Sequence, residues 1–358
     1  MGENRQKRKF HSLEMQKNIL FIAPSYMDLY KDIIEEMKKQ GYNVDYIPEV
    51  TFKDDPDNIR GYIKYGSFWV NKDKFKQKNS SRWKELLAKS EYSKVYDYLV
   101  VLDGQSVDGC VFDILKERNK NIYCVNYLFD TTYGVYKFQT NFDRFNKVFS
   151  FDPIDVKKYG LNFLPIYWVP CSVDEKYHYG IFGLGALSQP RFLLFDKLEG
   201  LCKENGITYY LKLLSNMKIG NSYMYAIRCF YRKLIGQGKN NIPLSTYHSH
   251  LVTNQGLPPA LFRVYIASAD VVIDTSAAHQ KGMTARFMWA LGTGKRIITS
   301  NQEVRYTEFM SDRIFIYTES SQDCELLDFI SSSDSSSEKE TAFEEYRIDN
   351  WLKTILEY

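Results

Sequence analysis

A loop rich in hydrogen-bond donors lies within residues 268–301, SADVVIDTSAAHQKGMTARFMWALGTGKRIITSN. The apolar residues 271–274 predict a strand, the polar residues 275–282 a loop, and residues 283–291 a helix. A loop that enters a helix collects unpaired backbone N–H groups and the positive end of the helix dipole. This order therefore favours the binding of a phosphate group at the start of the helix.

The side chains of this loop add further donors to those of its backbone. The candidate donor-binding residues of the loop and helix are His279, Gln280, Lys281, Gly282, Thr284, Arg286 and Trp289. Thr284 and Arg286 are the strongest of them because they occupy the start of the predicted helix. The apolar residues of that helix form one stripe: Met283, Phe287, Ala290 and Leu291. Arg286 and Trp289 fall on another side, so we expect Arg286 to avoid the core.

A second group of candidates follows the apolar residues 181–184. Gly183 and Gly185 predict a turn at which the backbone can approach a ligand. Arg191 opens the next predicted helix, and Lys212 lies near the end of the next predicted strand. We expect these residues to reach the same ligand as the loop, with a plain surface position as the alternative for Lys212.

Two aspartates follow predicted strands in the first half of the chain. Asp103 comes directly after the strand at residues 97–102, and Asp130 follows the strand at residues 121–127. Ligands of open α/β sheets bind outside the carboxyl ends of the strands. Either carboxylate is therefore a candidate general base for a hydroxyl group. The alternative is a turn-forming or helix-capping role.

Strands and helices alternate in two series along the sequence. Predicted strands occupy residues 18–23, 43–47, 97–102, 121–127, 147–150, 181–184, 208–213, 271–274, 296–299 and 314–317. Predicted helices occupy residues 29–39, 107–118, 190–205, 223–234, 258–268 and 283–291, whereas residues 50–95 predict no regular element. This alternation predicts an α/β fold with two doubly wound domains that face one another.

Two segments carry a resemblance to a known family. One is YDYLVVLDGQSVDGCVFDILKERNKNIYCVNYLFDTT, residues 96–132, followed by KVFSFDPIDVKKYGLNFLP, residues 147–165. The other, HQKGMTARFMWALGTGKRIITSN, is similar to the pattern G-x-T-x-R-x-x-E-A-L-x-x-G-K. The chain thereby resembles the bacterial GT-B glycosyltransferases that build lipopolysaccharide and capsular polysaccharide.

The resemblance implies two Rossmann-like domains with a central cleft, the second of which holds a nucleotide sugar. We place the first, acceptor-side domain at residues 1–168 and the second at residues 169–340. A C-terminal helix at residues 341–358 is expected to pack back on the first domain. One position departs from the family pattern, because Trp289 stands where the family has a glutamate that binds the donor ribose. An indole offers only an N–H donor and cannot accept a hydrogen bond from a ribose hydroxyl.

Composition excludes several other classes of protein. Of the 358 residues, 44% are hydrophobic, and no run approaches the roughly 18 apolar residues of a membrane span. Six scattered cysteines without a CxxC pair indicate reduced thiols in a cytoplasmic protein. The net charge of +3 is too small to indicate nucleic acid. A basic N-terminus, MGENRQKRKF, suggests peripheral contact with an anionic membrane at the inner face of the plasma membrane, with a solvated tail as the alternative.

These observations predict a glycosyltransferase that moves a hexosyl or related sugar from a nucleotide sugar to a hydroxyl of a lipid-linked surface glycan. No metal and no cofactor are expected, because no residues with metal-ligand spacing are evident and the nucleotide sugar is a co-substrate. Two alternatives remain open. One is a non-catalytic homologue that binds a glycan or nucleotide in an assembly complex, and the other is a sugar-nucleotide epimerase. The residues do not distinguish inversion from retention at the anomeric carbon.

Overall fold

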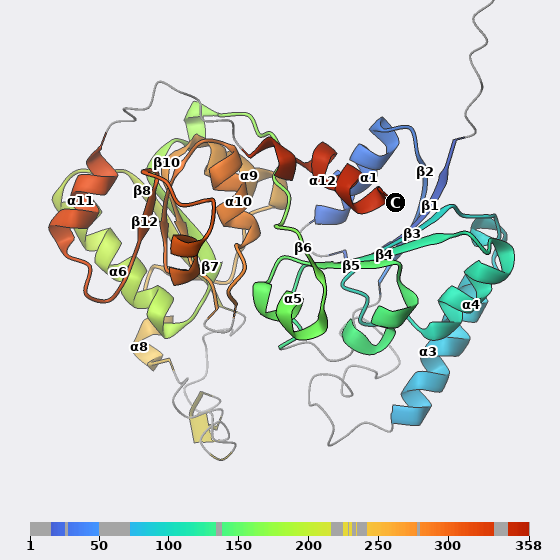
Figure 1. Cartoon of the computed structure of the whole chain (residues 1–358). Coiled ribbons are helices and arrows are strands. Elements are labelled where there is room, and N and C mark those ends of the chain that lie inside the picture. The colour runs from blue at the N-terminus through green and yellow to red at the C-terminus, as the bar shows by residue number, and fades with distance from the viewer. Residues whose placement is uncertain are drawn as a thin grey trace, which may run out of the picture. The chain divides into compact units, whose positions relative to one another are not determined.

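The computed structural model describes residues 16–25, 28–49, 72–133, 138–215, 225–227, 229–230, 234, 242–277, 280–332 and 343–357 (Figure 1). The basic N-terminal residues for which membrane contact is predicted lie outside these ranges. The chain divides into two compact units, Met1–Val148 and Phe149–Tyr358.

A six-stranded parallel sheet begins in the first unit. Its strands are β1 (Asn18–Ala23), β2 (Asn43–Pro48), β3 (Tyr98–Leu102), β4 (Tyr123–Leu128), β5 (Lys147–Ser150) and β6 (Asn162–Phe163), in the order β2-β1-β3-β4-β5-β6. β5 crosses the boundary between the units. The chain moves from β1 to β2 in one direction and then returns to add β3 and β4 on the other side of β1. The carboxyl ends of β1 and β3 therefore form the switch point at which sheets of this kind bind ligands.

The helices of the first unit bury an apolar core against this sheet. They are α1 (Leu29–Lys39), α3 (Lys72–Leu87) and α4 (Gly109–Arg118), with short 3-10 turns η3 (Ser90–Tyr92) and η4 (Phe138–Arg144). The expectation that residues 50–95 contain no regular element is wrong for α3. Its Trp83 and Leu87 are fully buried in a cluster with residues of β1, β3 and α4, and the Trp83 indole donates to Ser106 O at 2.7 Å.

A second six-stranded parallel sheet lies in the second unit. Its strands are β7 (Tyr179–Ala186), β8 (Tyr209–Leu214), β9 (Val252–Thr253), β10 (Ala269–Asp274), β11 (Arg296–Thr299) and β12 (Ile314–Ile316), in the order β12-β11-β10-β7-β8-β9. Its switch point lies between β7 and β10, which pair directly through Val271 and Ile181. Two parallel sheets with this winding confirm the predicted α/β, doubly wound fold.

Helices cover both faces of the second sheet (Figure 1). The helices of the second unit are α5 (Pro153–Tyr159), α6 (Gln189–Glu204), α8 (Leu244–Tyr247), α9 (Pro259–Ser268), α10 (Ala285–Gly292), α11 (Asp323–Ser331) and α12 (Ile348–Leu356), with 3-10 turns η5 (Glu175–Tyr177), η7 (Gln302–Tyr306) and η8 (Glu344–Tyr346). Ile181 of β7 packs in a core cluster with residues of α6 and α11. The next residue, Phe182, contacts Phe262 and Tyr265 of α9 on the opposite face.

The C-terminal helix is shorter than predicted. α12 begins only at Ile348, because residues 344–346 form the 3-10 turn η8. Its Trp351 is fully buried, donates from its indole to Pro165 O at 3.1 Å and packs edge-on against Tyr167. The domain limits at residues 168 and 340, and the packing of this helix on the first domain, stay predictions. Among the described residues, no helix has the length and apolar character that crossing a membrane requires.

The end of α10 gives a direct test of packing in the second unit. A Cβ atom on Gly292 would overlap the indole ring of the buried Trp168, whereas one on Gly200 of α6 would meet no atom within 4 Å. We therefore expect Gly292→Ala to lower the free energy of unfolding by about 1–3 kcal/mol. Gly200→Ala should leave it unchanged or raise it by about 0.5–1 kcal/mol, since alanine favours a helix. Urea denaturation measures both variants, and equal stability of the two would contradict this packing.

Candidate functional site

Two arginine side chains meet at the switch point of the second sheet. Arg191 lies in the first turn of α6, which follows β7, and Arg286 lies in the first turn of α10, which follows β10. A methyl group placed on Gly185, at the end of β7, would lie 3.7 Å from Arg286 Nη2 and 3.9 Å from Arg191 Nε. Because Gly185 has no side chain, a space remains beside its backbone, and both guanidinium groups border this space.

Arg191 is held against the ends of β7 and β10. Its Nη1 donates to Ala186 O at 3.0 Å, and its Nη2 donates to Thr275 O at 2.9 Å. Burial lowers the pKa of the Arg191 guanidinium, the positive charge of Arg286 lowers it further, and the Asp274 carboxylate partly offsets both. Two like charges in one partly buried place raise the electrostatic energy of the site, and an anion bound there would relieve it.

Arg286 is positioned by the buried carboxylate of Asp274. Arg286 Nη1 donates to Ile273 O at 3.2 Å and lies 3.8 Å from Asp274 Oδ1. The same oxygen accepts the Thr284 hydroxyl at 2.5 Å, and Asp274 Oδ2 accepts the Thr299 hydroxyl at 3.1 Å. Thr284 Oγ1 in turn caps α10 by accepting the Phe287 N–H at 3.1 Å. One carboxylate thus fixes the start of α10 and the arginine in its first turn.

A buried hydroxyl lies beside the arginine pair. Thr275 is 4% exposed, and its Oγ1 has no hydrogen-bond partner within the described ranges. Its carbonyl oxygen is the one that accepts from Arg191. A buried hydroxyl without a partner is costly, so this atom is a candidate contact for a bound ligand.

Some hydrogen-bond donors of the loop before α10 are bonded to other groups of the protein. Lys281 N and Gly282 N donate to Asp152 Oδ2 at 2.8 Å and 3.0 Å, and Asp152 is buried. Lys281 Nζ pairs with Glu303 at 2.7 Å and borders a cavity of about 660 Å³ beside α5. Gln280 Nε2 makes a long contact of 3.4 Å to Gly282 O. Their predicted contact with a donor phosphate stays a prediction, and His279 lies outside the described residues.

Three other predicted donor-binding residues lie in different surroundings. A Cβ on Gly183 would lie 2.9 Å from side chains of Leu211 and Phe195, so this glycine lets α6 pack on the sheet. Lys212 Nζ donates to a backbone carbonyl, that of His250, at 2.8 Å. Trp289 is 4% exposed and donates from its indole to Tyr167 O at 3.1 Å. Trp289 lies on a different side of α10 from the apolar stripe, as predicted, and this side of the helix is buried as well.

Three carboxylates of the first unit each come after a strand of the first sheet. Asp103 follows β3, Asp130 follows β4, and Glu49 follows β2. Asp103 is 8% exposed, has a φ of 60°, and accepts the N–H groups of Phe129 and Asp130 at 2.7 Å and 3.2 Å. Asp130 is exposed to solvent. Sequence reasoning missed Glu49, although its place directly after a strand is the same signal that identified the two aspartates.

Glu49 holds the turn that follows Asp103. Its carboxylate accepts Gly104 N at 3.2 Å, Ser106 N at 2.6 Å and Ser106 Oγ at 3.0 Å, and the side chain is buried. Burial raises the pKa of Glu49 to about 7 against the lowering effect of these hydrogen bonds. Burial first, and then the charges of Asp130 and Glu49, raise the pKa of Asp103 well above its usual range. Asp103 and Glu49 therefore favour the protonated form more than an exposed carboxyl does.

No arrangement of three or more His, Cys, Asp or Glu side chains that could hold a metal ion occurs among the described residues. Metal-independent chemistry without a cofactor stays a prediction.

Solved structures share the architecture of this chain. The UDP-forming α,α-trehalose-phosphate synthase of Burkholderia xenovorans is similar with a TM-score of 0.57 and 12% identity, over 96% of this chain and 98% of that chain. The α,α-trehalose-phosphate synthase of Burkholderia vietnamiensis is similar with a TM-score of 0.58 and 8% identity, over 94% of this chain and 98% of that chain. The UDP-GlcNAc 2-epimerase of Neisseria meningitidis, bound to UDP-GlcNAc, is similar with a TM-score of 0.50 and 10% identity, over 95% of this chain and 98% of that chain.

No protein-family model matches the sequence, and no curated protein matches it either. At these identities the likeness concerns the fold alone. Together with the two parallel six-stranded sheets and their flanking helices, it defines the chain as a protein of the GT-B fold.

The raised pKa of Glu49 predicts how the stability of the protein depends on pH. The pKa of Glu49 is about 7 in the folded protein, whereas the ordinary value, which applies to the unfolded chain, is 4.5. The unfolded chain therefore loses this proton first, and the free energy of unfolding falls as the pH rises between the two values. Glu49→Gln cannot titrate and should reduce this loss, while Asp103 leaves part of it in place. Thermal unfolding between about pH 5 and pH 8 measures the effect. Glu117→Gln, at an exposed position on α4, should retain the wild-type pH dependence, and the same dependence in Glu49→Gln would contradict the assignment.

Proposed function

We propose that the protein is a glycosyltransferase that binds the diphosphate of a nucleotide-sugar donor between Arg191 and Arg286. The observation that carries this proposal is the position of both guanidinium groups beside Gly185, at the switch point of the second sheet. The start of the sixteen-residue helix α6 adds the positive end of a helix dipole to the two arginines. Thr275, with its buried hydroxyl, supplies one further contact for a phosphate oxygen.

The chemistry of transfer makes use of such a site. As the bond between the sugar and the diphosphate breaks, negative charge develops on the departing phosphate oxygen. Fixed cationic donors stabilise that charge most where they are already positioned before the reaction. Arg286 is held in this way by Ile273 O and Asp274, and Arg191 by two carbonyl oxygens. The two trehalose-phosphate synthases of the same fold form UDP, which agrees with a site of this kind.

Asp130 is the general base in this proposal if the reaction inverts the anomeric carbon. It would take the proton of the acceptor hydroxyl while the hydroxyl oxygen attacks the sugar and the nucleoside diphosphate departs. Asp130 is exposed to solvent, whereas Asp103 is buried and uses Oδ1 to hold the N–H groups of Phe129 and Asp130. Asp103 is therefore a positioning residue, and Glu49 supports the turn beside it.

The finer parts of the proposal rest on the family resemblance of the sequence. They are a hexosyl or related sugar, a lipid-linked glycan of lipopolysaccharide or capsule as acceptor, and a cytoplasmic site of action at the membrane surface. The ribose of the donor would be bound by a group other than position 289, since Trp289 is buried and its indole N–H is bonded to Tyr167 O.

A non-catalytic binding protein is the alternative that Trp289 supports, and an epimerase is a further alternative with the same fold. Release of nucleoside diphosphate from a nucleotide sugar separates the three. A glycosyltransferase releases it in step with glycosylation of an acceptor, and a binding protein releases none. An epimerase converts the nucleotide sugar when no acceptor is present.

Replacement of Arg286 tests the donor site. We expect Arg286→Ala to weaken the binding of nucleoside diphosphate by about tenfold or more, because a charge-assisted hydrogen bond to a phosphate is lost. Isothermal titration calorimetry measures the change, and Arg286→Lys should recover part of the affinity through its charge. Arg305→Ala, at an exposed arginine of η7, is the matched control and should bind as the wild type does. Wild-type affinity in folded Arg286→Ala would remove Arg286 from the site.

Replacement of Asp130 tests the acceptor side. We expect Asp130→Asn to lower kcat by about 100-fold or more, since an amide cannot take the proton of the hydroxyl. The affinity for nucleoside diphosphate should stay at the wild-type value. Asp143→Asn, at another exposed aspartate of the first unit, should retain activity. Transfer rates that are equal in the wild type and Asp130→Asn would exclude Asp130 as the base.

A further inference from the structure

A cavity of about 660 Å³ lies in the second unit beside α5. Its volume falls within the range of about 300–1,000 Å³ that is typical of sites for small ligands. Neither arginine of the candidate donor site lines it. Its lining residues come from α5, from the loop before α10 and from η7: Pro153, Ile154, Lys157, Lys158, Lys281 and Glu303.

One buried carboxylate holds the two walls of this cavity together. Asp152 Oδ1 accepts the Ile154 N–H at 2.8 Å, which caps α5. Asp152 Oδ2 accepts the N–H groups of Lys281 and Gly282 at 2.8 Å and 3.0 Å. A Cβ atom on Gly282 would overlap Phe151 O, so a side chain at this position would push the loop away from α5. The cavity is therefore formed by the fold before any ligand binds.

Lysine side chains give the lining of this cavity a positive charge. Three of its six residues are lysines, and one is an acid, Glu303, which pairs with Lys281 at 2.7 Å. Lys157 and Lys158 are exposed to solvent. α5 has one acidic residue, Asp155, which is buried and does not line the cavity. The lining thus carries two more positive than negative charges, and a bound anion would lower its electrostatic energy.

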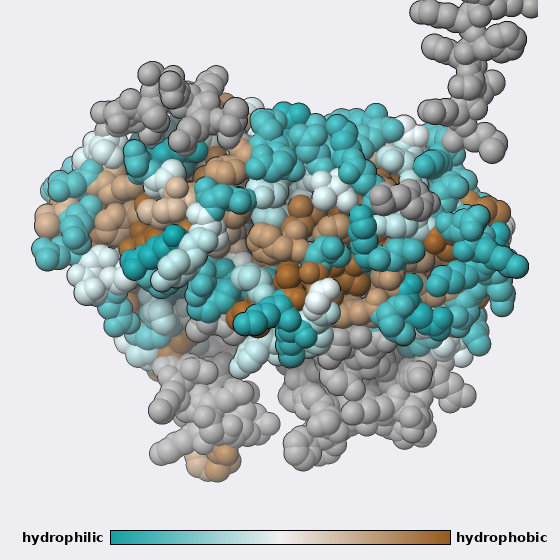
Figure 2. All heavy atoms as spheres, viewed as in Figure 1, coloured by the Kyte–Doolittle hydropathy of each residue, from teal (hydrophilic) through white to brown (hydrophobic). Residues whose placement is uncertain are grey.

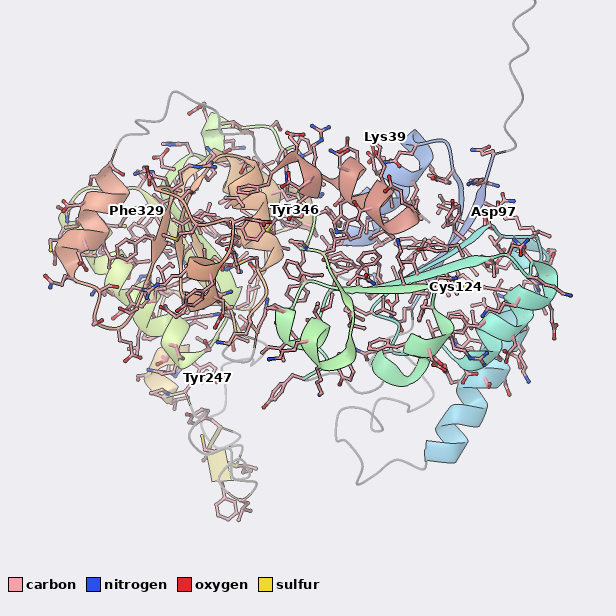
Figure 3. All side chains as sticks on the ribbon, viewed as in Figure 1. Lys39, Asp97, Cys124, Tyr247, Phe329 and Tyr346 are labelled. Atoms are coloured by element: carbon pink, nitrogen blue, oxygen red, sulfur yellow. The ribbon has the colours of Figure 1, made fainter. Side chains whose placement is uncertain are left out.

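An apolar surface lies beside these charges. Pro153 and Ile154 form part of the lining, and Ile154 is 47% exposed. Hydrophobic and hydrophilic residues lie side by side over α5 in Figure 2, and side chains of this helix project outward in Figure 3. Contact with the C–H groups of a ligand would remove this apolar surface from water. A small inorganic anion would use the lysines alone, whereas a larger ligand would also cover the apolar surface.

We propose that this cavity binds an anionic sugar, which is a sugar ring that carries a carboxylate or a phosphate group. The ammonium groups of Lys157 and Lys158 pair with the anionic group, and Ile154 packs against the C–H groups of the ring. Glu303 accepts a ring hydroxyl in addition to the Lys281 ammonium, since a carboxylate has acceptor sites for several donors. Lysine acts as a point charge, so both kinds of anion fit this chemistry.

The role of this sugar follows from the proposed function. If the protein is a glycosyltransferase, the anionic sugar is a unit of its acceptor glycan, and this assignment rests on that proposal. The binding of the sugar does not, because it is measured without nucleotide, while the binding of nucleoside diphosphate is measured without sugar. Lys157 and Lys158 belong to the cavity alone, whereas Lys281 is also a candidate contact of the donor.

Titration of the full chain with sugars, followed by saturation-transfer NMR, tests the proposal. The probes are glucuronate and galacturonate, the 6-phosphates of glucose and galactose, and the two neutral parent sugars. We expect at least one acidic sugar to bind about tenfold more tightly than its neutral parent. The double variant Lys157→Gln, Lys158→Gln should lose this preference and keep the wild-type affinity for the neutral sugars and for nucleoside diphosphate. The matched control Lys176→Gln, Lys353→Gln removes two other exposed lysines of the same unit and should bind as the wild type does.

The outcomes separate the two sources of negative charge from the absence of a site. Tighter binding of a carboxylated sugar identifies a uronic acid as the ligand, and tighter binding of a 6-phosphate identifies a sugar phosphate. Equal affinity of every acidic sugar and its neutral parent would overturn the proposal, and so would an unchanged preference in the double variant. A double variant that loses affinity for nucleoside diphosphate but not for sugars would assign the two lysines to the donor site instead.

Discussion

The Asp274 carboxylate is the constraint on which the candidate donor site depends. It is 1% exposed, and its two oxygens accept the hydroxyls of Thr284 and Thr299 and face the guanidinium of Arg286. A buried carboxylate is stable only when such partners replace water. These partners come from the loop before α10, from α10 itself and from β11. The carboxylate therefore joins three elements at one end of the sheet and orients the arginine that the proposed chemistry needs.

Charge is used in opposite ways in the two units. In the second unit, Asp274 keeps Arg286 beside a second cation, Arg191, and two like charges in one partly buried place favour a bound anion. In the first unit, Glu49 and Asp103 are buried carboxyls that hold backbone N–H groups of the turns after β3 and β4. Their pKa values are raised by burial, whereas Asp130, the proposed general base, is exposed to solvent. The proposed binding of a diphosphate thus depends on paired cations, and the proposed removal of a proton depends on an exposed carboxylate held beside buried ones.

The sequence predicted well those features that depend on local pattern. β1, α1 and β5 have their predicted limits, and the alternation of strands and helices identified both sheets. The strand-end rule identified Asp103, a glycine turn identified Gly185 and Arg191, and the start of a predicted helix identified Arg286. α3 escaped prediction because its polar sequence, KDKFKQKNSSRWKELL, is held by a few buried side chains such as Trp83.

Other features depend on contacts between residues far apart in the sequence. The bond from the Trp289 indole to Tyr167 O spans 122 positions, and that from Gly282 N to Asp152 spans 130. No local pattern shows that Trp289 is buried, or that part of the loop before α10 is bonded to a carboxylate. Glu49 could have been found from the sequence, because it comes directly after a predicted strand. It was overlooked because residues 50–95, which follow it, have no clear periodicity.

The central claim is that two arginines at the switch point of the second sheet hold a diphosphate. Calorimetric titration of the full chain with nucleosides and their mono- and diphosphates, in the uridine, guanosine, thymidine and cytidine series, tests it most directly. The account predicts that within the series of the true donor each added phosphate strengthens binding by about tenfold. Equal affinity for the monophosphate and diphosphate in every series, or no binding of any diphosphate, would contradict it.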